Sequence, residues 1–175
     1  MHPAPTTTLR ATIAALRAEE KPAAQTAMAA FAAELAAKGV KVAGVVQERV
    51  ADPASGRSRV MLRDLSNGAL YPISQDLGPG STACNLDAGE IAKACGALET
   101  AANGGVDLLV ISKFAKVEAE RGGFSDAFRI AISKRVPIVT AVSPHYLAEW
   151  RAFAGDLARF HDATPEALRE WWAGL

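Results

Sequence analysis

The residues best suited to chemistry lie in one stretch, Ser74 to Asp87, between a strand-like and a helix-like segment. Its two glycines permit backbone conformations that are closed to other residues. Asp87, three residues before Glu90, is typical of a helix N-cap, so the stretch would bring free N–H groups and a positive dipole end to one place. Such a place suits phosphate or another oxyanion; the alternative is an ordinary Pro-Gly turn and helix cap. The candidate ligand-binding residues here are Gln75, Asp76, Gly78, Gly80, Ser81, Thr82, Cys84 and Asn85.

A second candidate region follows the apolar run from Val106 to Ser112, which predicts a buried strand. Nucleotide hydrolases place a magnesium-holding aspartate at such a strand end. This chain has Ser112 there, with Lys113 beside it, and a lysine attracts an anion rather than a metal. The loop that we expect from Lys113 to Gly123 adds more charge, and its alternative is a solvated surface loop. The candidates from this region are Ser112, Lys113, Lys116, Glu118 and Arg121.

The expected loop after the first strand, Arg17 to Gln25, is where a phosphate-binding P-loop would lie in a nucleotide hydrolase of this architecture. It contains no glycine, and the pattern of glycine, four residues, glycine, lysine and serine or threonine is absent. Without glycines the backbone cannot wrap a triphosphate in the usual way. This argues against ordinary ATP or GTP hydrolysis.

The elements that must position these residues alternate between β-branched runs and amphipathic helices. Such alternation predicts parallel βαβ units in one three-layer α/β/α domain over residues 9–175, after a disordered tail at 1–8. Asn67-Gly68 predicts a β-hairpin inserted at the edge of the sheet. The expected strands cover residues 9–16, 40–47, 60–65, 69–73, 106–112 and 137–142. The expected helices cover residues 26–38, 87–103, 124–135, 146–160 and 165–172.

Composition narrows the classes of partner. The 175 residues carry 19 acidic and 19 basic side chains, so no global field attracts nucleic acid or a membrane surface. No apolar run reaches membrane-spanning length, and the N-terminus does not resemble a signal peptide, which indicates a cytoplasmic protein. Three histidines and no Cys-x-x-Cys motif argue against a metal site. Cys84 is either a reactive thiol or a small buried residue, and Cys95 is expected to be buried in a helix.

Several segments resemble a bacterial family of unknown function whose genes often lie near molybdate transport and molybdenum-enzyme genes. The likeness runs from about residue 13 to residue 157, and Ser112 and Ala115 replace an asparagine and a glycine that the family usually carries. The family is in turn similar in layout to the nucleoside-triphosphatases of thermophiles. The resemblance therefore implies a P-loop-type fold whose catalytic parts are replaced. The segments that carry it are 44–47, 74–80, 84–87 and 112–118.

Residues and resemblance together favour a non-hydrolytic protein that binds an anion or nucleotide, accessory or regulatory in molybdenum metabolism. Molybdate or a nucleotide is the expected ligand, and a homo-oligomer or a molybdenum-pathway protein is the expected partner. One alternative is an enzyme acting on a phosphorylated or molybdenum-related substrate. The other is a pure protein-interaction module.

Overall fold

The computed structural model describes residues 11–18, 22–74 and 87–175. Its strands are β1 (Ile13–Arg17), β2 (Val42–Ala51), β3 (Ser58–Asp64), β4 (Leu70–Pro72), β5 (Leu108–Phe114), β6 (Ile138–Val142) and β7 (Ala158–His161). Its α-helices are α1 (Ala23–Ala37), α2 (Ala88–Asn103), α3 (Lys116–Ala119), α4 (Ser125–Ser133), α5 (Leu147–Ala154) and α6 (Pro165–Ala173). Two short 3-10 helices, η1 (Pro144–Tyr146) and η2 (Gly155–Leu157), flank α5.

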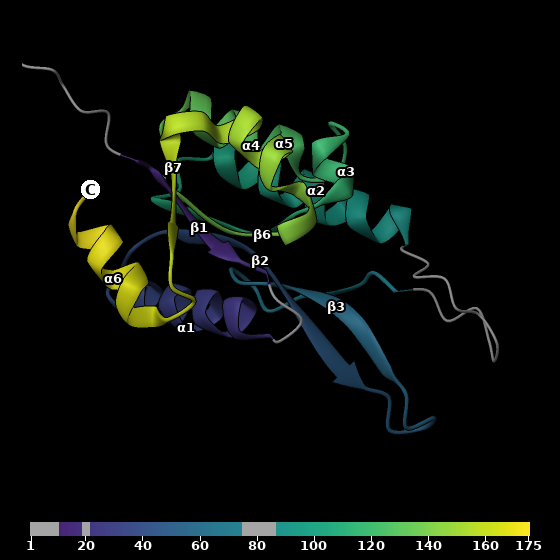
Figure 1. The fold of residues 1–175 in the computed structure, drawn as a ribbon. Coiled ribbons are helices and arrows are strands. Elements are labelled where there is room, and N and C mark those ends of the chain that lie inside the picture. Colours follow the sequence, from purple (N-terminus) through teal and green to yellow (C-terminus); the bar gives the residue numbers. More distant parts are fainter. Residues whose placement is uncertain (1–10, 19–21, 75–86) are drawn as a thin grey trace, which may run out of the picture.

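The strands form one seven-stranded sheet in the order β4-β3-β2-β5-β6-β1-β7 (Figure 1). From β2 to β7 along that order, neighbouring strands pair in parallel. At the other edge, β3 pairs with β2 and β4 pairs with β3, both antiparallel. The expected sheet, mainly parallel with an antiparallel hairpin at its edge, is confirmed.

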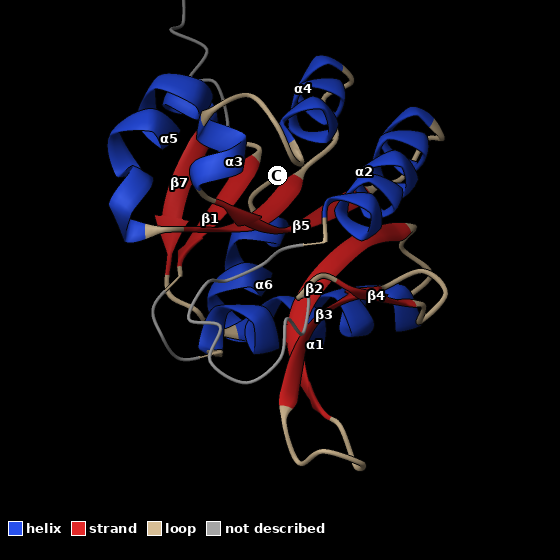
Figure 2. Ribbon diagram, turned by 90° about the vertical axis from the view of Figure 1, so that its right-hand side faces the viewer, coloured by secondary structure: helices blue, strands red, loops and turns tan. Residues whose placement is uncertain are grey.

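Helices cover both faces of the sheet, which gives the expected three layers. Helices α2 to α5 lie over one face, and α1 and α6 lie over the other (Figures 1 and 2). Each face has its own apolar core, because side chains alternate between the faces along each strand. Ring contacts dominate the core under α4 and α5, where Phe114 lies 5.0 Å from Trp150 and 6.0 Å from Phe128 between ring centroids. No described helix has the length and apolar character that crossing a bilayer requires.

Local sequence signals explain where several elements begin and end. The side chain of Asp87 accepts a hydrogen bond from Glu90 N at 3.0 Å, so the N-cap expected for α2 is present. Thr164 caps α6 in the same way, through Ala167 N at 3.2 Å. Gly39, just after α1, has φ +85°, a conformation that glycine adopts without strain. These features depend only on neighbours in the sequence, and all were predictable.

The C-terminal region differs from the expected long helix over 146–160. Helix α5 ends at Ala154, Gly155 takes φ +52°, and the chain then forms β7. Residues Ala158 to His161 pair in parallel with Ile13 to Leu16 of β1. The spacing of Trp150, Phe153, Leu157 and Phe160 is helical. Phe160 nevertheless lies in a strand, because its segment pairs with β1. The indole of Trp171 also donates to the carbonyl oxygen of Ala11 at 3.0 Å, so both ends of the described chain meet at this side of the sheet.

The strand β2 also exceeds its expected length, running four residues past Gln47. It pairs with β3 along its whole extension, from Val45 opposite Asp64 to Ala51 opposite Ser58. The resulting two-stranded ribbon projects away from the helices (Figure 2). The predicted turn at Asn67-Gly68 joins β3 to β4, and Gly68 has φ +74°. A second hairpin, between β2 and β3, was not predicted.

Gly44 in β2 is a position where the neighbouring strand leaves no room for a β-carbon. It lies opposite Val110 of β5 and has φ +148°, and a β-carbon there would collide with the backbone of Val110. We predict that Gly44→Ala lowers the free energy of unfolding by about 2 kcal/mol or more, through the clash and the strained φ. Urea denaturation followed by circular dichroism measures this change.

Gly96→Ala is the matched control, because Gly96 lies within α2 and a β-carbon added there would meet no atom within 4 Å. It should stabilise the protein by about 0.5–1 kcal/mol, the usual gain of alanine over glycine in a helix. Equal effects of the two substitutions would show that Gly44 has no special role in strand packing.

Candidate functional site

A cavity of about 820 Å³ opens at the carboxyl edge of the parallel strands, beside the start of α1. Ala18, which follows β1, and Ser143, which follows β6, both line it. The chain leaves β1 for α1 on one face of the sheet and leaves β6 for α5 on the other face (Figure 1). Ligands of open α/β sheets bind at this kind of switch point, where neighbouring strands connect to opposite faces. The remaining lining residues are Pro22, Ala24, Gln25, Thr26, Ala29, Ala30, Val46, Gln47, Glu48, Arg49 and Lys113.

Gln25 ties three elements together at the wall of this cavity. Its side-chain amide donates to the carbonyl oxygen of Ser112 at 2.7 Å, and its side-chain oxygen accepts from Gln47 N at 2.8 Å. The first turn of α1 is thereby fixed to the middle of β2 and to the carboxyl end of β5. Sequence reasoning missed this residue because it assigned 17–25 to a loop. The available signal was Pro22, since proline often stands at the start of a helix.

Lys113 lines the cavity because the end of β5 is bulged. Ile111 pairs with Thr140 of β6, but Phe114 pairs with Val142, so β5 has one extra residue in this interval. Ile111 and Phe114 both belong to the core under α2 to α5, whereas the half-buried Lys113 lines the cavity on the α1 side. The predicted loop over 113–123 is therefore wrong at its start, since Lys113 and Phe114 belong to β5.

The cavity carries a surplus of positive charge. Among the described residues that line it, Glu48 is the only acidic one, and both of its carboxylate oxygens accept from the guanidinium of Arg63, at 2.6 and 3.0 Å. Lys113 and Arg49 form no ion pair with any residue that the structure describes. The cavity is therefore suited to an anion.

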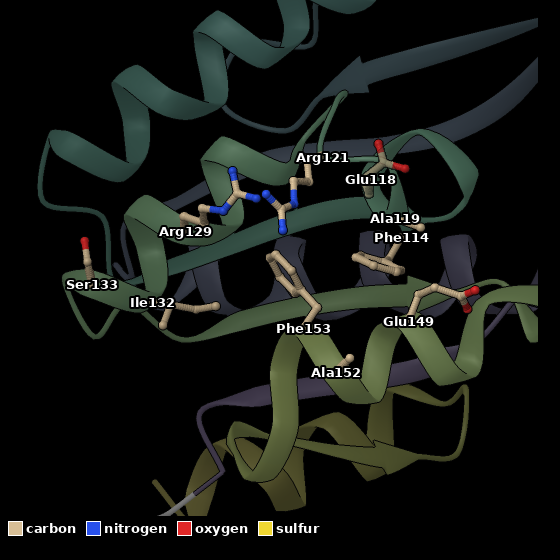
Figure 3. Close-up of a pocket in the computed structure, with 10 residues that line it drawn as sticks. All are labelled: Phe114, Glu118, Ala119, Arg121, Arg129, Ile132, Ser133, Glu149, Ala152 and Phe153. Carbon is tan, nitrogen blue, oxygen red and sulfur yellow. The ribbon is translucent and has the colours of Figure 1, made fainter.

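Glu118 and Arg121 line a different cavity, on the opposite face of the sheet (Figure 3). This second cavity, also about 820 Å³, lies among α3, α4 and α5. Lys116 begins α3 and is exposed. The structure thus places Lys113 in one cavity and Glu118 and Arg121 in another.

Glu118 holds the segment that follows β5. Its carboxylate accepts from Ala115 N at 3.1 Å and from Phe124 N at 3.2 Å, and it is buried. A β-carbon at Gly123, where φ is +53°, would collide with this carboxylate. Burial raises the pKa of Glu118, and the two hydrogen bonds and the charge of Lys113 only partly oppose this.

The other predicted site residues, Gln75, Asp76, Gly78, Gly80, Ser81, Thr82, Cys84 and Asn85, lie outside the residues that the structure describes. The residues that flank them are close together, because Asp87 N donates to the carbonyl oxygen of Ile73 at 2.7 Å. Ser74 Oγ accepts from Val60 N at 2.9 Å, and Val60 lies opposite Arg49 of β2. Both flanking residues are thus near the carboxyl end of β2.

No group of three or more histidine, cysteine, aspartate and glutamate residues within the described ranges is arranged to hold a metal ion. Cys95 is buried, as expected, and its thiol donates to the carbonyl oxygen of Gly123 at 3.1 Å. Burial raises the pKa of this thiol to about 11, so it is protonated at neutral pH and is a poor nucleophile or metal ligand.

Comparison with known proteins gives a family, a curated relative and a fold. A family model described as "Protein of unknown function (DUF2478)" matches residues 13–171. The Molybdenum import ATP-binding protein ModC 2 of Bradyrhizobium diazoefficiens is 34% identical over 147 residues, which are 84% of this chain and 16% of that protein. The chain therefore spans only about a sixth of that relative.

The crystal structure of THEP1 from the hyperthermophile Aquifex aeolicus shares the fold, with a TM-score of 0.55. The alignment covers 93% of this chain and 95% of that chain, at 15% identity. At this identity the likeness concerns the fold alone. It confirms the expected P-loop-type layout, and the family match confirms the expected resemblance.

Because the pKa of Glu118 is raised in the folded protein, this residue makes stability depend on pH. Its contribution to the stability of the folded protein is fully present when the pH is below the ordinary pKa of 4.5. That contribution is lost as the pH rises through the raised pKa of the folded protein. We predict that the parent loses stability relative to Glu118→Gln as the pH rises from about 4 to about 8. Urea denaturation at several pH values measures the difference, and Glu120→Gln, an exposed neighbour, is the control. A difference that does not change with pH would contradict the prediction.

Proposed function

This chain belongs to the DUF2478 family, which is described as a family of unknown function. From the geometry of its site, we propose that it binds a nucleotide or another anion without hydrolysing it. The observation that carries the proposal is the positively charged cavity at the carboxyl edge of the sheet. Its volume, about 820 Å³, is within the range of small-molecule sites and accommodates a nucleotide.

Two features of this cavity favour an anion. Lys113 supplies a charge for a charge-assisted hydrogen bond, and the exposed Arg49 also lines the cavity. The start of α1 also faces the cavity, and no described side chain caps it. The first N–H groups of a helix lack partners within the helix and carry a positive partial charge, which adds to the field of Lys113.

Gln25 supports the site rather than contacting the ligand. Both ends of its amide already hold Ser112 and Gln47, so it fixes the strand that carries Lys113 relative to the helix that faces the ligand. Such a fixed arrangement lowers the conformational entropy that the protein would otherwise lose on binding a ligand.

The absence of hydrolysis follows from the residues that a hydrolase would use. The sequence has no glycine from Arg17 to Gln25, where a P-loop would lie. Ser112 and Lys113 stand at the end of β5, where an acidic residue would hold magnesium. Glu48, the one carboxylate among the described lining residues of the cavity, is engaged by Arg63.

A role in molybdenum metabolism is supported by the name of the curated relative, a molybdenum import ATP-binding protein. We propose that this chain is an accessory or regulatory protein of such a pathway in the cytoplasm, with molybdate or a nucleotide as ligand. A pathway protein is the proposed partner. A bare molybdate ion would occupy a small part of the cavity, so we titrate both kinds of ligand.

We predict that Lys113→Ala weakens anion binding about tenfold to hundredfold, because it removes a charge-assisted contact worth roughly 1.5–3 kcal/mol. Isothermal titration calorimetry with ATP, GTP, molybdate, tungstate, sulfate and phosphate measures the affinities. Lys134→Ala, on an exposed residue at the end of α4, removes the same charge away from the cavity and should leave them unchanged. If no anion binds the parent, or if both variants bind equally, the proposal fails and the interaction module is the better interpretation.

We also predict that the purified protein releases phosphate from ATP and GTP no faster than buffer, with or without magnesium. A malachite-green assay over several hours measures the rate. Turnover that requires magnesium and disappears in Lys113→Ala would instead identify an enzyme that uses this cavity.

A further inference from the structure

We propose that the groove between α4 and α5 is a second ligand site, which takes an aromatic anion: a flat ring that carries a phosphate or carboxylate group. It lies on the opposite face of the sheet from the cavity with Lys113 and does not rest on the function proposed for that cavity. The groove has a volume of about 820 Å³ and is lined by residues of α3, α4 and α5 and by Phe114 at the end of β5.

Two arginines converge at one end of this groove. Arg121 follows α3 and Arg129 belongs to α4, and their guanidinium groups point toward one another above the ring of Phe153 (Figure 3). Arg129 donates from Nη1 to Asp126 at 2.9 Å, an exposed pair that leaves its other N–H donors available. Arg121 forms no ion pair with the described residues. Like charges that point toward one another repel, and an anion bound between them would relieve the repulsion.

The backbone of Arg121 is held in a conformation that is unfavourable for an arginine. Its φ is +68°, in the left-handed region that glycine or asparagine adopts more readily. The segment is fixed on both sides, since Arg121 N donates to the carbonyl oxygen of Glu118 at 3.0 Å and Gly122 N to that of Val117 at 2.8 Å. Backbone strain of this kind gathers at ligand sites, and here it sits under the side chain that faces the groove.

The rest of the groove is apolar and suits a ring. Phe114 and Phe153 form its floor, with ring centroids 5.4 Å apart, and Ile132 and Ala152 form walls. The guanidinium of Arg129 lies over Phe153, 6.0 Å from the ring centroid, so the anion-binding end and the aromatic floor adjoin. A ligand with both a ring and an anionic group would therefore use both parts at once.

Neither carboxylate of the groove forms an ion pair with its two arginines. Both oxygens of Glu118 already accept hydrogen bonds from the backbone, at Ala115 and Phe124. Glu149 extends away from the two arginines at the far side of Phe114 (Figure 3). The two guanidinium groups at the other end of the groove are therefore not engaged by these carboxylates.

Calorimetric titration with phenyl phosphate and with inorganic phosphate tests the two halves of the proposal. Arg121→Asn and Arg129→Gln should each weaken phenyl phosphate binding about tenfold or more, since each removes a charge-assisted contact. Phe153→Leu should weaken phenyl phosphate binding and leave the affinity for phosphate unchanged. Arg151→Gln, an exposed arginine of α5 that does not line the groove, is the control and should bind as the parent does.

Two further measurements separate ligand binding in the groove from a structural role of Arg121 and from binding in the Lys113 cavity. Asparagine tolerates a positive φ, so Arg121→Asn should keep the melting temperature of the parent while binding falls, which a purely structural role of Arg121 would not produce. Repeating the titrations in Lys113→Ala assigns the binding, because a site in the groove is unaffected by that change. The proposal is wrong if the parent does not bind phenyl phosphate, if the arginine variants bind as well as Arg151→Gln, or if binding is lost in Lys113→Ala alone.

Discussion

One extra residue in β5 decides which face of the sheet the side chains of Lys113 and Phe114 reach. The interval from Ile111 to Phe114 contains one more residue than the part of β6 that it faces. Without this bulge, strict alternation would place Phe114 and Ile111 on opposite faces. With it, Phe114 completes the aromatic core under α4 and α5, and Lys113 lines the cavity beside α1 instead of facing the same side as Ile111. A single bulge therefore places Phe114 in the core on one face of the sheet and Lys113 at the cavity on the other face.

The segment after the bulge is held by a small number of polar contacts rather than by a long helix. Helix α3 has four residues, too few to be stable alone, and the carboxylate of Glu118 joins its start to the start of α4. Gly123 leaves room for that carboxylate. On the other side of the sheet, Gln25 performs the same task for α1, β2 and β5. In both places one side chain with two hydrogen bonds positions the backbone. Lys113 and Arg121 are not used for this purpose, and neither forms an ion pair with a described residue.

The sequence allowed the prediction of features that depend on adjacent residues. The cap at Asp87, the turn at Gly68 and the three-layer order of elements are of this kind, and the resemblance to a family supplied the layout. Strand β7 was missed because its pairing with β1 is a contact between opposite ends of the chain, while its own residues continue a helical spacing. The bulge in β5 and the partners of Gln25 were missed for the same reason, since neither leaves a local pattern. Lys113 was assigned to an anion site from its position after a strand, and the structure places it in a cavity there.

The position of β1 in the sheet has a consequence for the order in which the molecule can form. This strand comes first in the chain, yet its two neighbours, β6 and β7, come last. During synthesis it must remain without its partners until nearly all of the described chain has been made, whereas β2, β3 and β4 find theirs within a short stretch. Four apolar side chains, Ile13 to Leu16, are fully buried in the folded protein, and over that time they lack the partner strands that complete this burial. The edge ribbon is thus free to fold early, and closure of the sheet around β1 is left as a late event that brings the walls of the Lys113 cavity together.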